Sequence, residues 1–120
     1  MNILIVDDEP QVAEVLARSL TREGHKASVA HSGEEALRRL GREEPDALFL
    51  DVSMPGMNGL DVLAEVKRRR PSLPVVVITG HATADEVDAV KRLGAIDVIE
   101  KPAPLTYYQL ALKRLDTRAS

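Results

Sequence analysis

The chain has 120 residues, of which 44% are apolar and 29% are charged, so it has the size and composition of one ordinary globular domain. It contains no cysteine, which excludes disulfide bonds and zinc sites built from thiolates. The net charge of −3 gives no general attraction to nucleic acid or to anionic membranes, and no apolar stretch is long enough to span a membrane. We therefore expect a cytoplasmic protein that binds neither nucleic acid nor membrane directly.

Five short apolar runs predict five β-strands. The runs span residues 3–6, 27–30, 47–50, 75–78 and 96–99. Four of them are continuously apolar, as expected for parallel strands that are covered on both faces. The second run is weaker and partly polar, which predicts an edge strand.

The segments that follow the strands carry apolar residues at helical spacing and predict five helices. The first four end at a glycine or proline, namely Gly24, Gly41, Pro71 and Gly94. Capping-box pairs open three helices: Ser32 with Glu35, Thr83 with Glu86, and Thr106 with Gln109. Alternating strands and helices with short loops predict an open α/β sheet with helices on both faces, and five units are too few for a (β/α)8 barrel.

Ionisable and hydroxyl side chains follow four of the five predicted strands, at the edge where open α/β sheets bind their ligands. They are Asp7, Asp8 and Glu9 after the first strand, Asp51 after the third, Thr79 after the fourth and Lys101 after the fifth. Two carboxylates 4 Å apart repel by about 4 kcal/mol at an effective dielectric of about 20, so such a cluster favours a hard cation such as Mg²⁺. With an amine and a hydroxyl nearby, the set predicts a phosphoryl-transfer site in which an aspartate is the nucleophile.

Each of these residues also has an ordinary structural interpretation. Asp8 precedes Pro10 and suits the N-cap of a helix, and Asp51 suits the start of a turn. A lysine before a proline is commonly a surface residue, and a threonine before a glycine is commonly a loop residue. Their conjunction at one sheet edge favours a site. The three histidines (His25, His31 and His81) have no metal-binding spacing, and we interpret them as solvated, with His81 near the rim of the site.

Four sequence motifs together resemble the receiver domain of bacterial two-component response regulators. The motifs are Ile3–Glu9, Asp51–Gly59, Val77–Gly80, and Gly94–Asp97 running on to Lys101-Pro102. The resemblance extends over residues 3–115. It implies a single receiver domain over residues 1–120. It also implies a doubly wound (βα)5, flavodoxin-like open parallel sheet with strand order 2-1-3-4-5.

The resemblance also implies a phosphoacceptor and a metal site. Asp51 matches the residue that takes a phosphoryl group from a sensor histidine kinase or phosphotransfer protein. Asp7 and Asp8 match the acidic pair that binds Mg²⁺ together with Asp51, and the backbone carbonyl of Ser53 matches a further ligand.

The remaining matches concern the switch that follows phosphorylation. Thr79 matches a hydroxyl that moves to the phosphoryl group, and Lys101 matches the lysine that pairs with it; the bond from Lys101 to Pro102 is expected to be cis. Val98 stands where many receivers have an aromatic residue, so an aromatic rotamer switch is absent there. The output face is expected to comprise the helix after Thr83, the strand at residues 96–99 and the last helix.

The expected function is a signalling switch controlling an output domain or target protein, as in transcriptional regulators, and not an enzyme beyond its own phosphorylation and slow self-dephosphorylation. A homodimer through the fourth and fifth helices is plausible on this view. A phosphohydrolase is disfavoured because it needs a second aspartate where this chain has Ser53. Dinucleotide binding is disfavoured because no Gly-x-Gly-x-x-Gly follows a strand. A degenerate receiver that acts as a constitutive interaction module remains the alternative.

Overall fold

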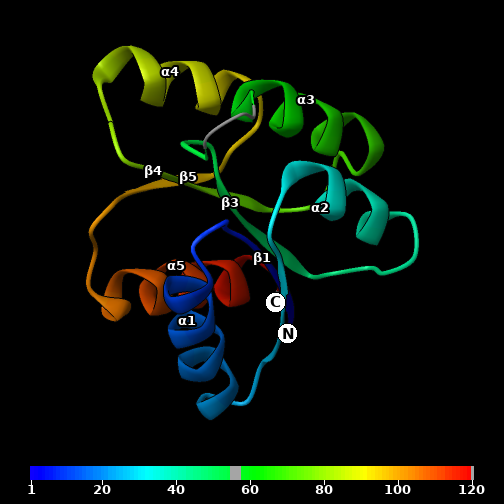
Figure 1. Ribbon diagram of the computed structural model, residues 1–120, viewed down its shortest axis with the longest axis vertical. Helices are drawn as coiled ribbons and strands as arrows, with labels where there is room; N and C mark the ends of the chain where they lie inside the picture. Colours follow the sequence, from blue (N-terminus) through cyan, green and yellow to red (C-terminus); the bar gives the residue numbers. More distant parts are fainter. Residues whose placement is uncertain (55–57, 120) are drawn as a thin grey trace.

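The computed structural model describes residues 1–54 and 58–119, with side chains as far as residue 115. Within these residues, strands and helices alternate along the chain (Figure 1). The strands are β1 (Asn2–Val6), β2 (Lys26–Ala30), β3 (Ala47–Asp51), β4 (Val75–Thr79) and β5 (Asp97–Glu100). The helices are α1 (Pro10–Arg22), α2 (Gly33–Leu40), α3 (Gly59–Arg69), α4 (Ala84–Arg92) and α5 (Leu105–Ala119). Every strand boundary lies within one residue of its prediction.

The strands form one parallel sheet in the order β2-β1-β3-β4-β5, which confirms the predicted topology and the edge position of β2. Val6 of β1 pairs with Leu50 of β3, which in turn pairs with Val77 of β4, so the carboxyl ends of the central strands lie almost level. The chain reverses its direction of winding between β1 and β3. In open α/β sheets this switch point is where ligands bind.

The sheet separates two apolar cores, because successive side chains of a strand point to opposite faces. Helices α1 and α5 cover one face, and α2, α3 and α4 cover the other (Figure 1). Ile5 of β1 packs into the core under α1 and α5, whereas its neighbour Val6 packs into the opposite core. The rings of Phe49 and Tyr108 meet edge to face with their centroids 5.6 Å apart, which adds an aromatic contact to a largely aliphatic interior.

The helix caps agree with the sequence in part. Ser32 and Thr83 cap α2 and α4 as predicted, each accepting a backbone N–H three residues later. Asp8 is not the N-cap of α1, because Glu9 occupies that position ahead of Pro10. The predicted third capping box, Thr106 with Gln109, is wrong.

Helix α5 begins before the predicted capping residue Thr106. The carbonyl of Pro104 accepts the N–H of Tyr107 at 3.0 Å, so the helix begins at Leu105, two residues earlier than a cap at Thr106 would give, and Thr106 lies inside the helix. Gly24 and Gly94 follow α1 and α4 with φ of 93° and 107°, a left-handed conformation that glycine adopts without steric strain.

The start of α3 fixes the loop that follows β3. Asn58 caps the helix by accepting the N–H groups of Leu60 and Asp61, a cap that the sequence analysis missed. Gly59 packs so closely that a Cβ at this position would lie 2.4 Å from Cβ of Val52. Pro55, Gly56 and Met57 of the second motif lie outside the described residues.

Candidate functional site

The carboxyl edge of the sheet brings most of the predicted site residues together. Asp51 and Thr79 are the last residues of β3 and β4, Asp7 follows β1, and Lys101 follows β5. Asp7, Asp51 and Thr79 are each only 1% exposed, and among the described residues they are the only polar or charged ones that are buried. Because burying a polar or ionisable group is unfavourable without a compensating partner, three such residues at one edge indicate a site selected for its chemistry.

The ammonium group of Lys101 joins the carboxylates of this site. Its Nζ lies 2.6 Å from Oδ2 of Asp51, 3.0 Å from Oδ2 of Asp7 and 3.3 Å from Oε1 of Glu9. The backbone N–H of Lys101 donates to the carbonyl of Thr79 at 2.8 Å, which ties the end of β5 to the end of β4. The peptide bond from Lys101 to Pro102 is cis, which confirms the prediction.

Burial and mutual contact shift the pKa values of Asp7 and Lys101. Burial raises the pKa of the Asp7 carboxyl, and the nearby Asp51 carboxylate raises it further. The N–H of Glu9 and the ammonium of Lys101 act in the opposite direction, but the net pKa stays raised. Burial lowers the pKa of Lys101, but its hydrogen bonds to Asp51 and Asp7 and their negative charges outweigh this, so the net pKa is raised. Lys101 is therefore a permanent cation at neutral pH.

The second oxygen of Asp51 is held by Ser53. Oδ1 accepts the backbone N–H of Ser53 at 2.8 Å and its hydroxyl at 2.7 Å. One oxygen of the Asp51 carboxylate is thus held by neutral donors and the other by the Lys101 ammonium. The carboxylate is oriented within the cleft before any ligand arrives.

Three further acidic residues form a cluster with this carboxylate. Asp7, Asp8, Glu9 and Asp51 each place one oxygen so that all four lie within 4.8 Å of one another. Carboxylate oxygens from both a buried and an exposed pair suit a hard, partly hydrated cation. The donor set therefore fits Mg²⁺, which the sequence predicted. The part assigned to the Ser53 carbonyl stays a prediction.

Thr79 lies close to the site but its hydroxyl is turned to α4. Its Oγ1 donates to Oε1 of Glu86 and accepts the backbone N–H of His81 at 3.1 Å. Among the described residues, no hydrogen bond joins this hydroxyl to Asp51. The contact with Glu86 was not predicted, because the Thr83–Glu86 spacing suggested that this carboxylate would bond the N–H of Thr83.

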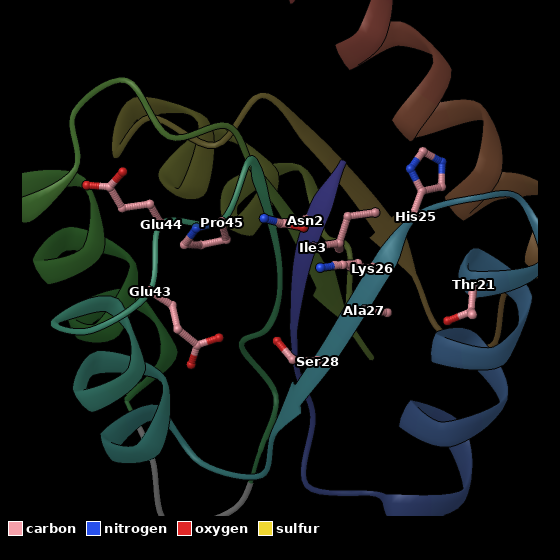
Figure 2. Close-up of a pocket in the computed structure, with 10 residues that line it drawn as sticks. All are labelled: Asn2, Ile3, Thr21, His25, Lys26, Ala27, Ser28, Glu43, Glu44 and Pro45. Carbon is pink, nitrogen blue, oxygen red and sulfur yellow. The ribbon is translucent and has the colours of Figure 1, made fainter.

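Two of the hollows in the described part of the chain lie at opposite edges of the sheet. One, of about 730 Å³, opens beside Thr79 and is bounded by the ends of β3 and β4 and the starts of α3 and α4. The other, of about 650 Å³, lies at the opposite, amino edge of the sheet (Figure 2). The second contains none of the predicted site residues. It is lined by Asn2, Ile3, Thr21, His25, Lys26, Ala27, Ser28, Glu43, Glu44 and Pro45.

An open parallel α/β sheet with a buried aspartate, an acidic cluster and a lysine at its switch point defines a class of doubly wound domain with a candidate ligand site at the carboxyl edge. The family model described as the response regulator receiver domain matches residues 3–112. This chain belongs to that family, and its homologues include transcriptional response regulators of two-component systems.

Curated relatives are longer than this chain. The DNA-binding transcriptional regulator NtrC of Klebsiella pneumoniae is 41% identical over 98 residues, which are 82% of this chain and 21% of that protein. Response regulator MprA of Mycobacterium avium is 41% identical over 105 residues, or 88% of this chain and 46% of that protein. The chain thus spans between about a fifth and a half of the length of these relatives.

Solved structures agree with the fold. The receiver domain of NtrX from Brucella abortus has a TM-score of 0.87 at 36% identity and covers 94% of this chain and 96% of its own. TrrA from Thermotoga maritima, solved in complex with Mg²⁺-BeF, has a TM-score of 0.84 at 30% identity and covers 95% and 97%. Among the described residues of this chain, no helix is long and apolar enough to cross a membrane.

Proposed function

We propose that this domain is a phosphorylation-dependent switch in which Asp51 accepts a phosphoryl group from a sensor histidine kinase or phosphotransfer protein. The observation that carries the proposal is the buried Asp51 carboxylate, held at 2.6 Å by the Lys101 ammonium and surrounded by acidic side chains. The similarity to TrrA, which was solved with Mg²⁺-BeF, supports it.

The chemistry follows from the arrangement of these groups. A carboxylate oxygen of Asp51 attacks phosphorus in line, the bond from phosphorus to the donor's imidazole nitrogen breaks, and that nitrogen keeps the electron pair and takes up a proton. Lys101, already ion-paired with Asp51, is placed to pair with the phosphoryl oxygens. Asp7, Asp8 and Asp51, with the carbonyl of Ser53, would hold Mg²⁺, whose positive charge would offset the charge of the phosphoryl group.

The product alters the charge of the site and thereby the surface above it. An acyl phosphate on Asp51 replaces one negative charge by about −1.5 to −2 and adds strong acceptor oxygens. The hydroxyl of Thr79 then has a new acceptor, and its movement shifts the face formed by α4, β5 and α5. Tyr107 and Leu110 of α5 are 56% and 51% exposed, so this face carries apolar surface on which a homodimer or another partner can pack.

The partner of the switch is an output domain or a target protein. The greater length of the relatives supports an output domain, and their printed names support control of transcription. The chemistry of the domain itself is limited to its own phosphorylation and slow dephosphorylation, so we do not propose an enzyme that acts on other substrates. The domain is proposed to act in the cytoplasm.

The test is phosphorylation by a small donor. The protein is incubated with acetyl phosphate with and without Mg²⁺, and its intact mass is measured. Asp51→Asn removes the nucleophile with little change of shape, and Asp88→Asn, on the exposed side of α4, is the matched control. A single adduct that requires Mg²⁺ and Asp51 is expected. A folded wild-type protein without an adduct contradicts the proposal and favours a constitutive interaction module.

A further inference from the structure

Glu86, in the first turn of α4, holds the buried hydroxyl of Thr79. Oγ1 of Thr79 donates its hydrogen bond to Oε1 of Glu86 and accepts the N–H of His81. Thr79 is only 1% exposed, so little solvent reaches its side of this bond. The contact joins the end of β4 directly to the helix that begins five residues later.

A threonine hydroxyl has only one proton to donate. While that proton points to Glu86, it is not available to an acceptor on Asp51. The hydrogen bond to Glu86 and a hydrogen bond to a phosphoryl oxygen therefore exclude each other. The unphosphorylated arrangement described here is the one in which Glu86 accepts the hydrogen bond of the Thr79 hydroxyl.

Glu86 is also placed to respond to charge at Asp51. The hollow beside Thr79 is lined by both Glu86 and Ser53, and Ser53 holds Oδ1 of Asp51. The positive group described at Asp51 is Lys101, which contacts Oδ2. A phosphoryl group on Asp51 adds negative charge next to Ser53, which lines this hollow, and like charges repel, so the phosphoryl group disfavours the present position of the Glu86 carboxylate.

The capping-box motif offers the carboxylate of Glu86 a second donor at the start of its own helix. Thr83, the N-cap of α4, accepts the N–H of Glu86 at 3.2 Å, which is half of a capping box. The other half of that motif is a bond from the N–H of Thr83 to the Glu86 carboxylate. Glu86 can thus exchange its bond to Thr79 for a bond within α4, so release of Thr79 does not leave a carboxylate without a donor.

We propose that Glu86 is a latch that keeps Thr79 in the unphosphorylated arrangement. Through Glu86, the release of the Thr79 hydroxyl is linked to the position of α4. The proposal rests on phosphorylation of Asp51. The phosphoryl group opens the latch in two ways, by offering Thr79 a more strongly charged acceptor and by repelling Glu86. Glu86 is a positioning residue, because it acts through Thr79 and touches no reacting atom.

The latch has a measurable consequence for binding of a phosphoryl analogue. A ligand that binds only one of two arrangements of a protein has a higher apparent Kd when that arrangement is less populated. Hydrogen bonds to charged acceptors are stronger than neutral ones, and their loss shifts an equilibrium by on the order of tenfold or more. Glu86→Ala is therefore expected to lower the Kd for beryllofluoride by about tenfold. Glu86→Gln keeps a hydrogen-bond acceptor but removes the charge, so its Kd is expected to lie between those of the wild type and Glu86→Ala.

The experiment titrates beryllofluoride in the presence of Mg²⁺ and follows the amide signals by NMR. The proteins are the wild type, Glu86→Ala, Glu86→Gln and the control Asp88→Asn, which removes one charge from α4 without touching Thr79. The series is repeated in a Thr79→Val background, in which no hydroxyl remains to be held. There the substitution of Glu86 is expected to change the Kd by less than about twofold.

A tightening by Glu86→Ala that disappears in the Thr79→Val background supports the latch. An equal effect in both backgrounds, or an equal effect of Asp88→Asn, overturns it. The side-chain rotamer of Thr79, read from scalar couplings without any analogue, tests the contact independently: it is expected to change in Glu86→Ala. If the wild type binds no beryllofluoride, the proposed function fails, whereas an unchanged rotamer in Glu86→Ala refutes the latch alone.

Discussion

Replacing Asp7 by asparagine is expected to stabilise the protein at neutral pH. Burial raises the pKa of this carboxyl in the folded state, although the N–H of Glu9 and the ammonium of Lys101 oppose the rise. A carboxyl that binds its proton more tightly when folded opposes folding once it is ionised. The destabilisation is absent below the ordinary pKa of 3.8 and grows as the pH rises through the higher pKa of the folded state.

The size of the effect follows from the contacts of Asp7. At an effective dielectric of about 20, Lys101 at 3.0 Å attracts the carboxylate by about 5.5 kcal/mol. An oxygen of Asp51 within 4.8 Å repels it by at least about 3.5 kcal/mol. The remaining attraction of about 2 kcal/mol is smaller than the several kcal/mol needed to desolvate a buried ion. Asp7→Asn is therefore expected to raise the free energy of unfolding by about 1–2 kcal/mol.

Urea denaturation at a series of pH values measures this effect. The gain of Asp7→Asn over the wild type is expected to be largest at pH 7 and to shrink as the pH falls toward the ordinary range of aspartic acid. Asp88→Asn, which alters an exposed ion pair with Arg92, is expected to stay within about 0.5 kcal/mol of the wild type at neutral pH. A destabilised Asp7→Asn, or a gain independent of pH, would refute the reasoning.

Two further predictions concern the metal and the loop after β3. Mg²⁺ at ten times its Kd is expected to raise the free energy of unfolding by about 1.4 kcal/mol, and this gain, measured by denaturation, should be lost in Asp7→Asn. Gly59→Ala is expected to lower stability by about 1–3 kcal/mol, because its Cβ would lie 2.4 Å from that of Val52. In Gly80→Ala the new Cβ meets Ser53 Oγ only at 3.9 Å, so an equal loss in both variants would contradict the steric explanation.

The fold and the main site residues could be predicted because both depend on local patterns. Continuous apolar runs identify buried parallel strands, and glycine or proline marks the ends of the helices between them. Once the strands are parallel, the residues at their carboxyl ends must share one edge. Asp7, Asp51 and Thr79 follow from this geometry alone, without knowledge of any contact.

The hydrogen bonds made by side chains at the starts of the helices could not be predicted in the same way. Glu86 fits a capping box by spacing, yet its carboxylate bonds Thr79, because the path of the loop before α4 decides which donor is nearest. At α2 the corresponding carboxylate, that of Glu35, bonds the N–H of His31. Thr106 failed as a cap because Pro104 already begins the turn. In each case the tertiary path of the chain before the helix decides the outcome, and sequence spacing alone does not specify that path.

Helix α4 is anchored by little apolar surface. Within the part of the chain that the structure describes, Val90 is its single fully buried residue, whereas α1 buries Ala13, Leu16 and Leu20. Exposing one valine costs about 1.5–3 kcal/mol, which is the range of one or two strong polar contacts. Detaching α1 would require several times as much. On the proposed function, an acyl phosphate at Asp51 would therefore need to supply only this amount of free energy to reposition α4, while the sheet and the opposite helical layer stay as they are.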